Sequence, residues 1–479
     1  MTSFLFSCRE GETGLSIAMA QEPPSFDVMV NTSISGREIL VGNVFEKLLA
    51  YDEGEIVPLL AESYSSEDDG CTLRFRIRKG VLFHDGSPMT ISDAVASMNR
   101  WLSYSDAAEK IVKGSRFTVD GDDIVITSTS TLSLLPALIA TSSESAVIFR
   151  ASDIPSDGGI ITSEIGTGPY KVLDYSLGEK ISLGLFDEYH GEKPSISRLD
   201  YYFVSDPVTR RLGLESGTYD FIDTVSSDDI PVLSGREEVN VISGTENGSI
   251  ALLFNKKNGI SSSHDFRKGV SLLIDRDELM KACYGEYGYN IDSSYMEKDG
   301  IWYVDPSSDP YGEENREKAD TYLSEYKGQK VRILTSNLTG LDRIAVALFS
   351  QLREYGIEAE ITVLDWAAFL ERRKDSDAWD IAVTALTAVS LPLDKAFLSS
   401  DYPGWTDSEE ISALLEEIAS SESFRTASEL WGKAQILCWD YIPAIVLGHY
   451  STTHAVSSSI EGVKLSADGF DFRSAYIPE

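Results

Sequence analysis

The chain has 479 residues, and its 77 Asp and Glu outnumber its 41 Lys and Arg to give a formal net charge of −36 at pH 7. This charge argues against a nucleic-acid partner, because a phosphate backbone is bound through clustered Lys and Arg that release counterions. A hydrophobic content of 42% is typical of a globular protein, and at roughly 150 residues per domain the length predicts about two to three domains. No apolar run approaches the ~18 residues that cross a bilayer, so no membrane span is predicted.

Clean hydrophobic periods predict several elements in the first half of the chain. Leu73, Phe75 and Ile77 alternate with arginines, which indicates a strand with one buried and one exposed face. Thr90 to Asp93 form a capping box ahead of apolar residues at helical spacing, so a helix is predicted to begin at Ile91. Short apolar strands on either side of glycine-containing turns predict two hairpins, 117–119 with 124–126 and 170–175 with 180–185.

A strand followed by a capped helix is predicted near the middle of the chain. Residues 199–203 read as a strand, and Asp206-Pro207 then marks the start of a helix, because proline is favoured at the first helical position. Val208 and Leu212 of this helix are predicted to point inward, and Gly217 is predicted to end it.

A helix, a strand and a second helix follow one another in the last third. The first helix carries Ile344, Leu348 and Leu352 and ends at Gly356, residues 357–363 alternate as a strand, and Asp365 caps the next helix. This alternation of strands and helices predicts an α/β fold with covered sheets.

The sequence contains no motif of a catalytic or metal centre. It lacks a GxSxG elbow and a P-loop, and close carboxylate pairs are expected by chance among 77 acidic residues. The five histidines form no metal cluster, and the four cysteines form no CxxC pair. We therefore predict no enzymatic activity, no metal and no cofactor, and we interpret Cys71, Cys283 and Cys438 as small buried hydrophobic residues.

Cys8 differs from the other cysteines in its surroundings. Leu5-Phe6-Ser7 precede it, and the segment resembles the cleavage box of a bacterial lipoprotein, in which the cysteine becomes the lipidated amino terminus. The charged start and apolar core of a signal peptide do not precede this box, so residues 1–7 are interpreted as a remnant of an export signal, a misplaced start or an artificial addition. We expect lipidation of Cys8 and a location in the periplasm or on the outer face of the cytoplasmic membrane.

Several segments along the chain together resemble the family 5 extracellular solute-binding proteins of ABC importers, which include oligopeptide-, dipeptide- and nickel-binding proteins. The segments keep the order in which that family carries them. They are Ala20 to Asp27 (AQEPPSFD), Val44 to Asp52 (VFEKLLAYD), Pro58 to Ser63 (PLLAES), Arg78 to Thr90 (RKGVLFHDGSPMT), Gly166 to Tyr170 (GTGPY), Arg211 to Gly217 (RLGLESG), Phe254-Asn255 and Phe266 to Arg276 (FRKGVSLLIDR).

The resemblance implies a two-lobed periplasmic-binding-protein fold in which ligand is trapped between the lobes. It implies a first-lobe domain of residues 1–40, 166–248 and 443–479, with an inserted domain at 41–165. The second lobe would be residues 249–442, and the hinge strands would be 250–255 and 444–450, both short apolar runs.

The resemblance also bears on the ligand. Peptide-binding members carry an Asp that holds the peptide amino group, but here no acidic residue occurs between Asp380 and Asp394, and Val389 or Ser390 falls near the expected position. A buried ammonium without a counter-charge is costly, so a free peptide amino terminus is not expected to bind there.

By the same resemblance, eight residues are candidates for ligand contact. They are Phe26, Asn31, Ser33, Ser142, Ser143, Trp366, Thr387 and Trp405. The predicted function is the extracellular substrate-binding component of an ABC importer, a monomer that takes a peptide-like or other small polar solute and meets a membrane permease. Two alternatives stay open at this point: a secreted cell-surface hydrolase, and a sensory protein that reuses the binding fold.

Overall fold

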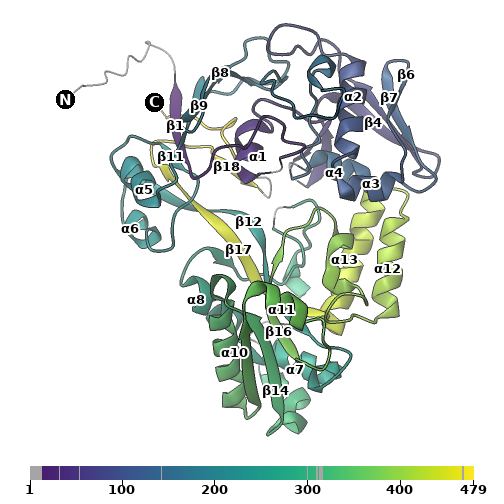
Figure 1. Ribbon diagram of the computed structural model, residues 1–479, viewed down its shortest axis with the longest axis vertical. Helices are drawn as coiled ribbons and strands as arrows, with labels where there is room; N and C mark the ends of the chain where they lie inside the picture. The colour runs from purple at the N-terminus through teal and green to yellow at the C-terminus, as the bar shows by residue number, and fades with distance from the viewer. Residues whose placement is uncertain are drawn as a thin grey trace. The chain divides into compact units, whose positions relative to one another are not determined.

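The computed structural model describes residues 13–31, 33–52, 54–141, 143–298, 300–308, 311, 317–466 and 469–478. Contacts group the chain into two compact units, here called unit 1 (Met1–Thr245 and Thr452–Glu479) and unit 2 (Glu246–Ser451). The chain passes from one unit to the other inside two long strands, β12 (Val239–Phe254) and β17 (Ala444–Ser457), which are labelled in Figure 1. The threefold division with an inserted domain at 41–165 stays a prediction.

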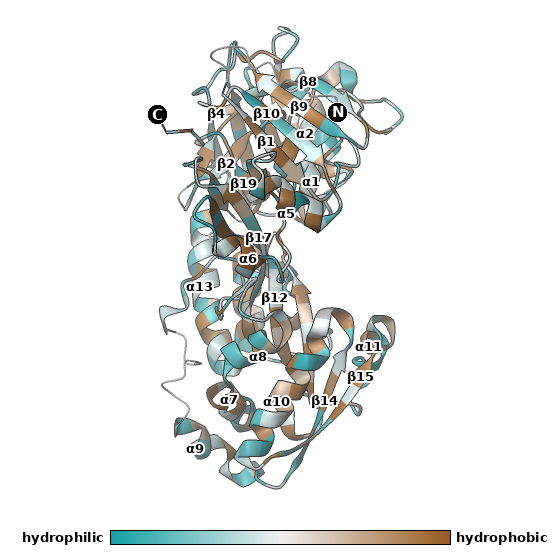
Figure 2. Ribbon diagram, turned by 90° about the vertical axis from the view of Figure 1, so that its left-hand side faces the viewer, coloured by the Kyte–Doolittle hydropathy of each residue, from teal (hydrophilic) through white to brown (hydrophobic). Residues whose placement is uncertain are grey.

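The main sheet of unit 1 has the strand order β17-β11-β1-β10-β9-β8. β1 pairs in parallel with both β10 and β11, whereas the other neighbours are antiparallel. The predicted hairpin 170–175 with 180–185 is confirmed as β8 and β9, and the predicted strand 199–203 as β10. Hydrophobic residues (brown in Figure 2) mark the central strand β1. The bounds are β1 Gly14–Met19, β8 Tyr170–Ser176, β9 Lys180–Leu185, β10 Arg198–Phe203 and β11 Phe221–Ile222.

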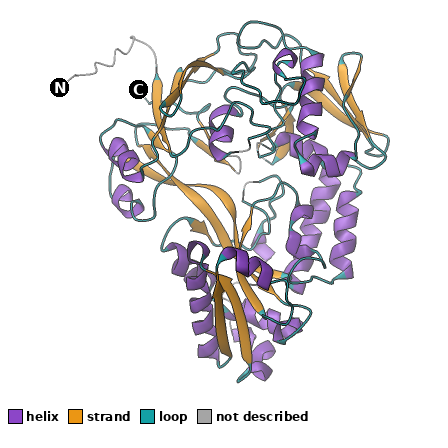
Figure 3. Ribbon diagram, in the orientation of Figure 1, coloured by secondary structure: helices purple, strands orange, loops and turns teal. Residues whose placement is uncertain are grey.

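A second, four-stranded sheet of unit 1 has the order β4-β5-β7-β6 (Figure 3). The predicted strand with Leu73, Phe75 and Ile77 is β5, and all three side chains are buried. The predicted helix begins at Ile91 as α2, where the Thr90 N–H donates to the Asp93 carboxylate at 2.7 Å. The bounds are β2 Leu49–Asp52, β3 Glu55–Pro58, β4 Ala61–Glu67, β5 Thr72–Ile77, β6 Thr118–Asp120, β7 Asp123–Thr127, α2 Ile91–Leu102, α3 Asp106–Val112 and α4 Leu135–Ala140.

Helix α5 (Pro207–Glu215) begins where the sequence predicts, with the Asp206 carboxylate accepting from the Thr209 N–H at 2.8 Å. The predicted inward face is wrong, because Val208 and Leu212 are 47% and 50% exposed. The helix buries Arg210 instead, whose guanidinium donates to the carbonyls of three residues in the loops beside it, Val204, Ser205 and Thr224. A buried guanidinium without hydrogen bonds costs more free energy than the burial of Val208 and Leu212 would gain. The bonds of Arg210 therefore set which face of the helix points inward.

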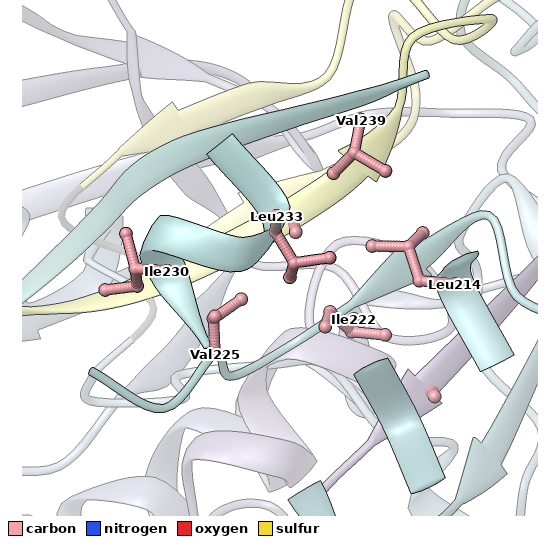
Figure 4. Packing of buried hydrophobic residues seen from close by; sticks show 8 residues of the cluster. Leu214, Ile222, Val225, Ile230, Leu233 and Val239 are labelled. Atoms are coloured by element: carbon pink, nitrogen blue, oxygen red, sulfur yellow. The ribbon is translucent and has the colours of Figure 1, made fainter. Parts of the chain in front are cut away.

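The other inward residue of α5, Leu214, belongs to a compact apolar cluster to which α5, α6 (Ile230–Ser234) and β11 all contribute side chains (Figure 4). The cluster consists of Ala18, Leu214, Ile222, Val225, Ile230, Leu233, Val239 and Ala455. It draws on the first strand, the middle of the chain and the last long strand, so it joins the amino- and carboxyl-terminal parts of unit 1.

The motif segments around Val44, His84 and Gly166 meet inside unit 1. A Cβ atom added to Gly166 would lie 1.8 Å from the Val44 carbonyl oxygen, so glycine alone allows the two backbones to approach this closely. The His84 N–H donates to the Gly166 carbonyl at 2.9 Å, and the buried Glu46 carboxylate accepts from the Thr167 hydroxyl at 2.9 Å. These contacts hold the three segments together within unit 1.

Unit 2 is built around a sheet with the order β15-β14-β16-β12. β14 pairs in parallel with both β15 and β16, and β16 pairs antiparallel with β12. The chain steps from β14 through α10 to β15 on one side, and from β15 through α11 to β16 on the other. Crossovers of this kind are right-handed, so α10 and α11 cover opposite faces of the sheet. The bounds are β14 Lys330–Ser336, α10 Leu341–Tyr355, β15 Glu358–Leu364, α11 Trp366–Arg372 and β16 Ile381–Thr387.

The predicted helices and strand of this region are confirmed. Ile344, Leu348 and Leu352 form the buried stripe of α10, and the Asp365 carboxylate accepts from the Ala368 N–H to cap α11 at 2.9 Å. The other elements are α7 His264–Leu273, α8 Arg276–Tyr284, β13 Tyr289–Asn290, α9 Ala319–Leu323, α12 Glu409–Ala419, α13 Phe424–Tyr441, and in unit 1 α1 Ile34–Leu40, β18 Lys464–Ser466 and β19 Gly469–Asp471. Of the three cysteines interpreted as buried, Cys438 is buried, whereas Cys71 and Cys283 are half-buried.

His454 of β17 is a buried titratable group in unit 1. It is 1% exposed, its Nδ1 donates to the Asp223 carbonyl, and its ring lies 5.5 Å from the ring of Phe221 and 5.6 Å from that of Phe470. Burial lowers the pKa of His454 to about 4, because the charged ring would lose its hydration. The folded protein therefore holds this imidazole neutral at pH values where the unfolded chain protonates it.

This burial predicts acid sensitivity with a defined window. As the pH falls below about 6.5, His454 is protonated in the unfolded chain but stays neutral in the folded protein, so the free energy of unfolding decreases. This decrease levels off below the folded pKa of about 4. The free energy of unfolding at pH 4.5 should be lower than at pH 7 by about 2–3 kcal/mol from this group. Urea titrations of His454→Phe should lack this part of the pH dependence, while His264→Gln, at an exposed histidine, should keep it. Equal pH dependence in both variants would refute the assignment.

Candidate functional site

Unit 1 contains a cavity of about 380 Å³ beside the loop that joins β1 to α1. The volume lies within the range of about 300–1,000 Å³ found for small-molecule sites. Three chain segments far apart in sequence supply the walls. The lining residues are Pro23, Pro24, Ser25, Phe26, Leu40, Ile161, Thr162, Glu164, Tyr175 and Ile181.

A buried ion pair holds two of these segments together. The Arg100 guanidinium of α2 donates to the Asp27 carboxylate at 2.5 Å, and the two side chains are 5% and 0% exposed. The same Asp27 oxygen accepts from the Ile161 N–H at 2.9 Å, and Arg100 also donates to the Gly159 carbonyl at 3.0 Å. The β1–α1 loop and the 159–161 segment, which both contribute residues to the cavity wall, are therefore fixed to each other by this ion pair.

An aromatic pair forms one wall. The rings of Phe26 and Tyr175 meet edge to face with their centroids 5.4 Å apart. The Tyr175 hydroxyl donates to the Glu22 carboxylate at 2.5 Å, and Glu22 also accepts from the Gly178 N–H at 3.1 Å. Burial, and then the hydrogen bond to Glu22, raise the pKa of Tyr175 to about 12, so this phenol stays neutral and anchors the β8–β9 turn.

The first-lobe candidates divide between the cavity and its support. Phe26 lines the cavity. The Asn31 side-chain amide donates to the Ser25 hydroxyl oxygen at 2.7 Å, so Asn31 positions a lining residue from behind. The Ser33 hydroxyl oxygen accepts from the Gly36 N–H at 3.0 Å as the cap of α1.

Ser143 does not line this cavity. Ser143 is exposed in the segment that follows α4. Ser142 and Cys8 lie outside the described residues. Their predicted roles in ligand contact and lipidation stay predictions.

Two of the unit 2 candidates share one edge of the sheet. Because β14, β15 and β16 are parallel, their carboxyl ends lie together, and ligands of open α/β sheets bind at such an edge. Trp366 follows β15, is half-exposed and stacks on Phe369 with the centroids 5.4 Å apart. Thr387 is exposed as the last residue of β16. This edge, here called the carboxyl edge of unit 2, is a second candidate binding surface.

Trp405 lies elsewhere in unit 2. Its ring stacks on Trp379, which precedes the amino end of β16, with the centroids 5.7 Å apart, and Lys257 Nζ lies 4.9 Å from its ring. The residue is 8% exposed and has a left-handed backbone, with φ of 49°. Trp366 therefore lies at the carboxyl ends of the strands of this sheet, and Trp405 lies at the amino end of β16. A ligand role for either ring alone stays a prediction.

The segment without an acidic residue continues from the carboxyl edge. The Ala388 N–H donates to the Asn247 carbonyl at 3.2 Å, and Val389 and Ser390 follow half-buried. Asp380, at the other end of β16, forms an ion pair with Arg332 of β14 at 2.9 Å, so its carboxylate links two neighbouring strands of the sheet. Glu246, which precedes Asn247, is buried and accepts from Asn290 at 3.1 Å and from the Lys298 N–H at 2.8 Å.

Sequence reasoning missed most of the cavity. Ile161, Tyr175 and Ile181 line it beside Phe26, but they come from segments more than a hundred residues away in the chain. The hairpin 170–175 with 180–185, which carries Tyr175 and Ile181, was predicted from the sequence. Its hydrophobic pattern did not indicate which other segment its side chains would contact.

The comparisons with known proteins agree with this architecture. The model of the bacterial extracellular solute-binding proteins, family 5, matches residues 55–408. A probable peptide ABC transporter periplasmic-binding protein of Sinorhizobium fredii is 25% identical, over 94% of this chain and 91% of that protein. A nickel-binding protein of Staphylococcus aureus is 26% identical, over 69% of this chain and 66% of that protein.

A solved structure shows the same fold. The unliganded open form of a periplasmic murein tripeptide-binding protein superposes with a TM-score of 0.84 at 18% identity, over 98% of both chains. Within the described residues, no helix is long and apolar enough to cross a membrane. The match of the family model to residues 55–408, most of the chain, establishes that the protein belongs to the bacterial extracellular solute-binding proteins, family 5.

Proposed function

We propose that the protein is the substrate-binding component of an ABC-type importer, a non-enzymatic carrier that captures a small solute outside the cytoplasm and delivers it to a membrane permease. The family match carries this proposal. The unit 1 cavity supports it, because aromatic and aliphatic walls with a few polar groups are typical of small-molecule sites.

The relatives do not fix the ligand. Those named above are described as binding peptides, a murein tripeptide or nickel, and a metal ion is chemically unlike a peptide. We propose a peptide-like or other polar organic solute, because the cavity offers apolar walls, hydroxyl groups and a single carboxylate. The eight candidate ligand residues are part of this proposal, with Phe26 and Trp366 as its centres in units 1 and 2.

Native mass spectrometry of the full chain purified from its own organism tests the function. We expect a bound solute that is released when the protein is denatured. When this solute is incubated with fresh protein and recovered, we expect it to be chemically unchanged. Recovery of a cleaved or otherwise altered solute would favour the hydrolase alternative over the carrier. A deletion strain that takes up the identified solute at the normal rate would contradict a transport role and favour the sensory alternative.

A separate mass-spectrometric measurement tests the membrane anchor. We propose that Cys8 carries a lipid and that the protein acts as a monomer on the outer face of the membrane, because Leu5 to Cys8 resemble a lipoprotein box. The amino-terminal peptide from native membranes should be heavier by one lipid modification. An unmodified Cys8 in membrane-free cytosol would refute the anchor without touching the carrier function.

A further inference from the structure

The residues that line the unit 1 cavity define the ligand more narrowly than family membership does. We infer that it binds an uncharged apolar side chain, branched aliphatic or aromatic, of a solute that places a carbonyl oxygen against the Ser25 hydroxyl. This inference rests on the proposed function and names the class of substrate for it.

The walls select for apolar groups. Seven of the ten lining residues are prolines, aliphatic residues or aromatic residues. Pro23, Leu40, Ile161 and Ile181 are buried, and the edge-to-face pair of Phe26 and Tyr175 presents further apolar surface. Burying a Leu or Phe side chain against such walls strengthens binding by roughly ten- to a hundredfold. A solute that offers only hydrogen at this position forgoes that gain.

The charges disfavour an anionic group. Among the described residues that line the cavity there is no Lys, Arg or His, and the one charged side chain is Glu164, which is exposed. Glu22 lies behind Tyr175, where it accepts from the Tyr175 hydroxyl and the Gly178 N–H. A carboxylate or phosphate inside the cavity would therefore lie near the Glu164 carboxylate with no cationic lining residue as its counter-ion, whereas a neutral group meets no such penalty.

Ser25 supplies a directed donor. Its Oγ accepts from Asn31 Nδ2 at 2.7 Å and from the Asp27 N–H at 3.2 Å. These bonds use the oxygen as an acceptor, and a hydroxyl still has one proton to donate. Among the described residues no acceptor for this proton is found, so a carbonyl oxygen of the solute can take it. An amide, such as that of a peptide, joins this acceptor to an apolar side chain in one molecule.

Small capped amino acids test the inference on the full chain. N-acetyl-leucinamide carries the side chain and the neutral carbonyl, N-acetyl-glycinamide lacks the side chain, and N-acetyl-leucine adds a carboxylate. With the isoleucine methyl groups labelled with ¹³C, we expect N-acetyl-leucinamide to shift the resonances of Ile161 and Ile181. Its affinity should exceed that of the glycine probe and that of the carboxylate probe by at least tenfold. Equal affinities, or shifts confined to other isoleucines, would overturn the inference.

A matched pair of variants locates the binding. Thr162→Phe places a ring in the cavity from an exposed lining position, so the fold is spared, and binding of N-acetyl-leucinamide should weaken at least tenfold. Ile160→Phe places the same ring two positions away at a residue that is 51% exposed and does not line the cavity, so binding should be unchanged. An equal effect of both variants, or of neither, would refute the site. Thermal melts of both variants confirm that each is folded.

The outcome separates this inference from the proposed function. If the deletion strain loses uptake but Thr162→Phe binds the probe normally, the carrier function stands and the assignment of the cavity fails. If the probe binds as expected while the deletion strain takes up the solute normally, the cavity stands and the transport role fails.

Discussion

Asp27→Asn is expected to lower the free energy of unfolding by about 3–5 kcal/mol, the cost of leaving one partner of a buried ion pair without its counter-charge. Arg100 is 5% exposed beside Asp27, so water cannot replace the lost carboxylate charge. Because Asp27 also accepts from the Ile161 N–H, the wall of the unit 1 cavity should loosen together with the fold. Urea unfolding followed by circular dichroism measures the loss.

Two comparisons make this prediction specific. The double variant Asp27→Leu with Arg100→Met removes both charges, and it should lose clearly less than the sum of the two single variants. Asp122→Asn breaks the exposed pair with Lys79, in which the side chains are 59% and 74% exposed, and it should leave the unfolding curve unchanged. If Asp27→Asn behaves like Asp122→Asn, the pair contributes nothing to the fold.

Gly166→Ala should lower the free energy of unfolding by about 3 kcal/mol or more, because overpacking against backbone leaves no flexible side chain to move aside. The added Cβ would lie 1.8 Å from the Val44 carbonyl oxygen and 2.9 Å from the Phe45 ring. Hydrogen bonds pin both sides of this contact, since Gly168 N donates to the Val44 carbonyl at 3.0 Å and His84 N to the Gly166 carbonyl at 2.9 Å. The midpoint of urea unfolding reports the loss.

Gly432→Ala is the matched control for this variant. Gly432 lies inside α13, and a Cβ atom there meets nothing within 4 Å. In a helix interior alanine is favoured over glycine by about 0.5–1 kcal/mol, so Gly432→Ala should raise the midpoint. Midpoints that move the same way in the two variants would show that the contact between Gly166 and Val44 is not as close as described.

Local pattern predicts the elements of this protein well where period and cap agree. The capping box at Thr90, the alternation around Phe75 and the stripe of Ile344 and Leu348 each indicate one structure, and each occurs there. Helix α5 shows the limit of such reasoning, because its period was read from Val208 and Leu212 while a buried arginine sets its rotation. A buried cation bound by loop carbonyls leaves no trace in hydrophobic spacing.

The candidate site was predictable only as a region. Phe26 followed from a family resemblance in its own segment, but its cavity neighbours Ile161 and Tyr175 are brought to it by an ion pair and by a sheet that join distant parts of the chain. Trp405, by contrast, was a candidate for ligand contact, but its ring stacks on Trp379 at the amino end of β16, where its left-handed backbone places it. Spacing along the chain carries neither kind of information.

The position of Trp366 gives the protein an optical property. All seven tryptophans lie within the described residues, and six of them, Trp101, Trp302, Trp379, Trp405, Trp431 and Trp439, are at most 8% exposed. Trp366 is half-exposed at the carboxyl edge of unit 2. A water-soluble quencher such as acrylamide reaches indoles that face solvent, so the quenchable part of the emission comes from this one ring. The unaltered protein therefore carries its own fluorescent reporter at this edge, above a background of six shielded indoles.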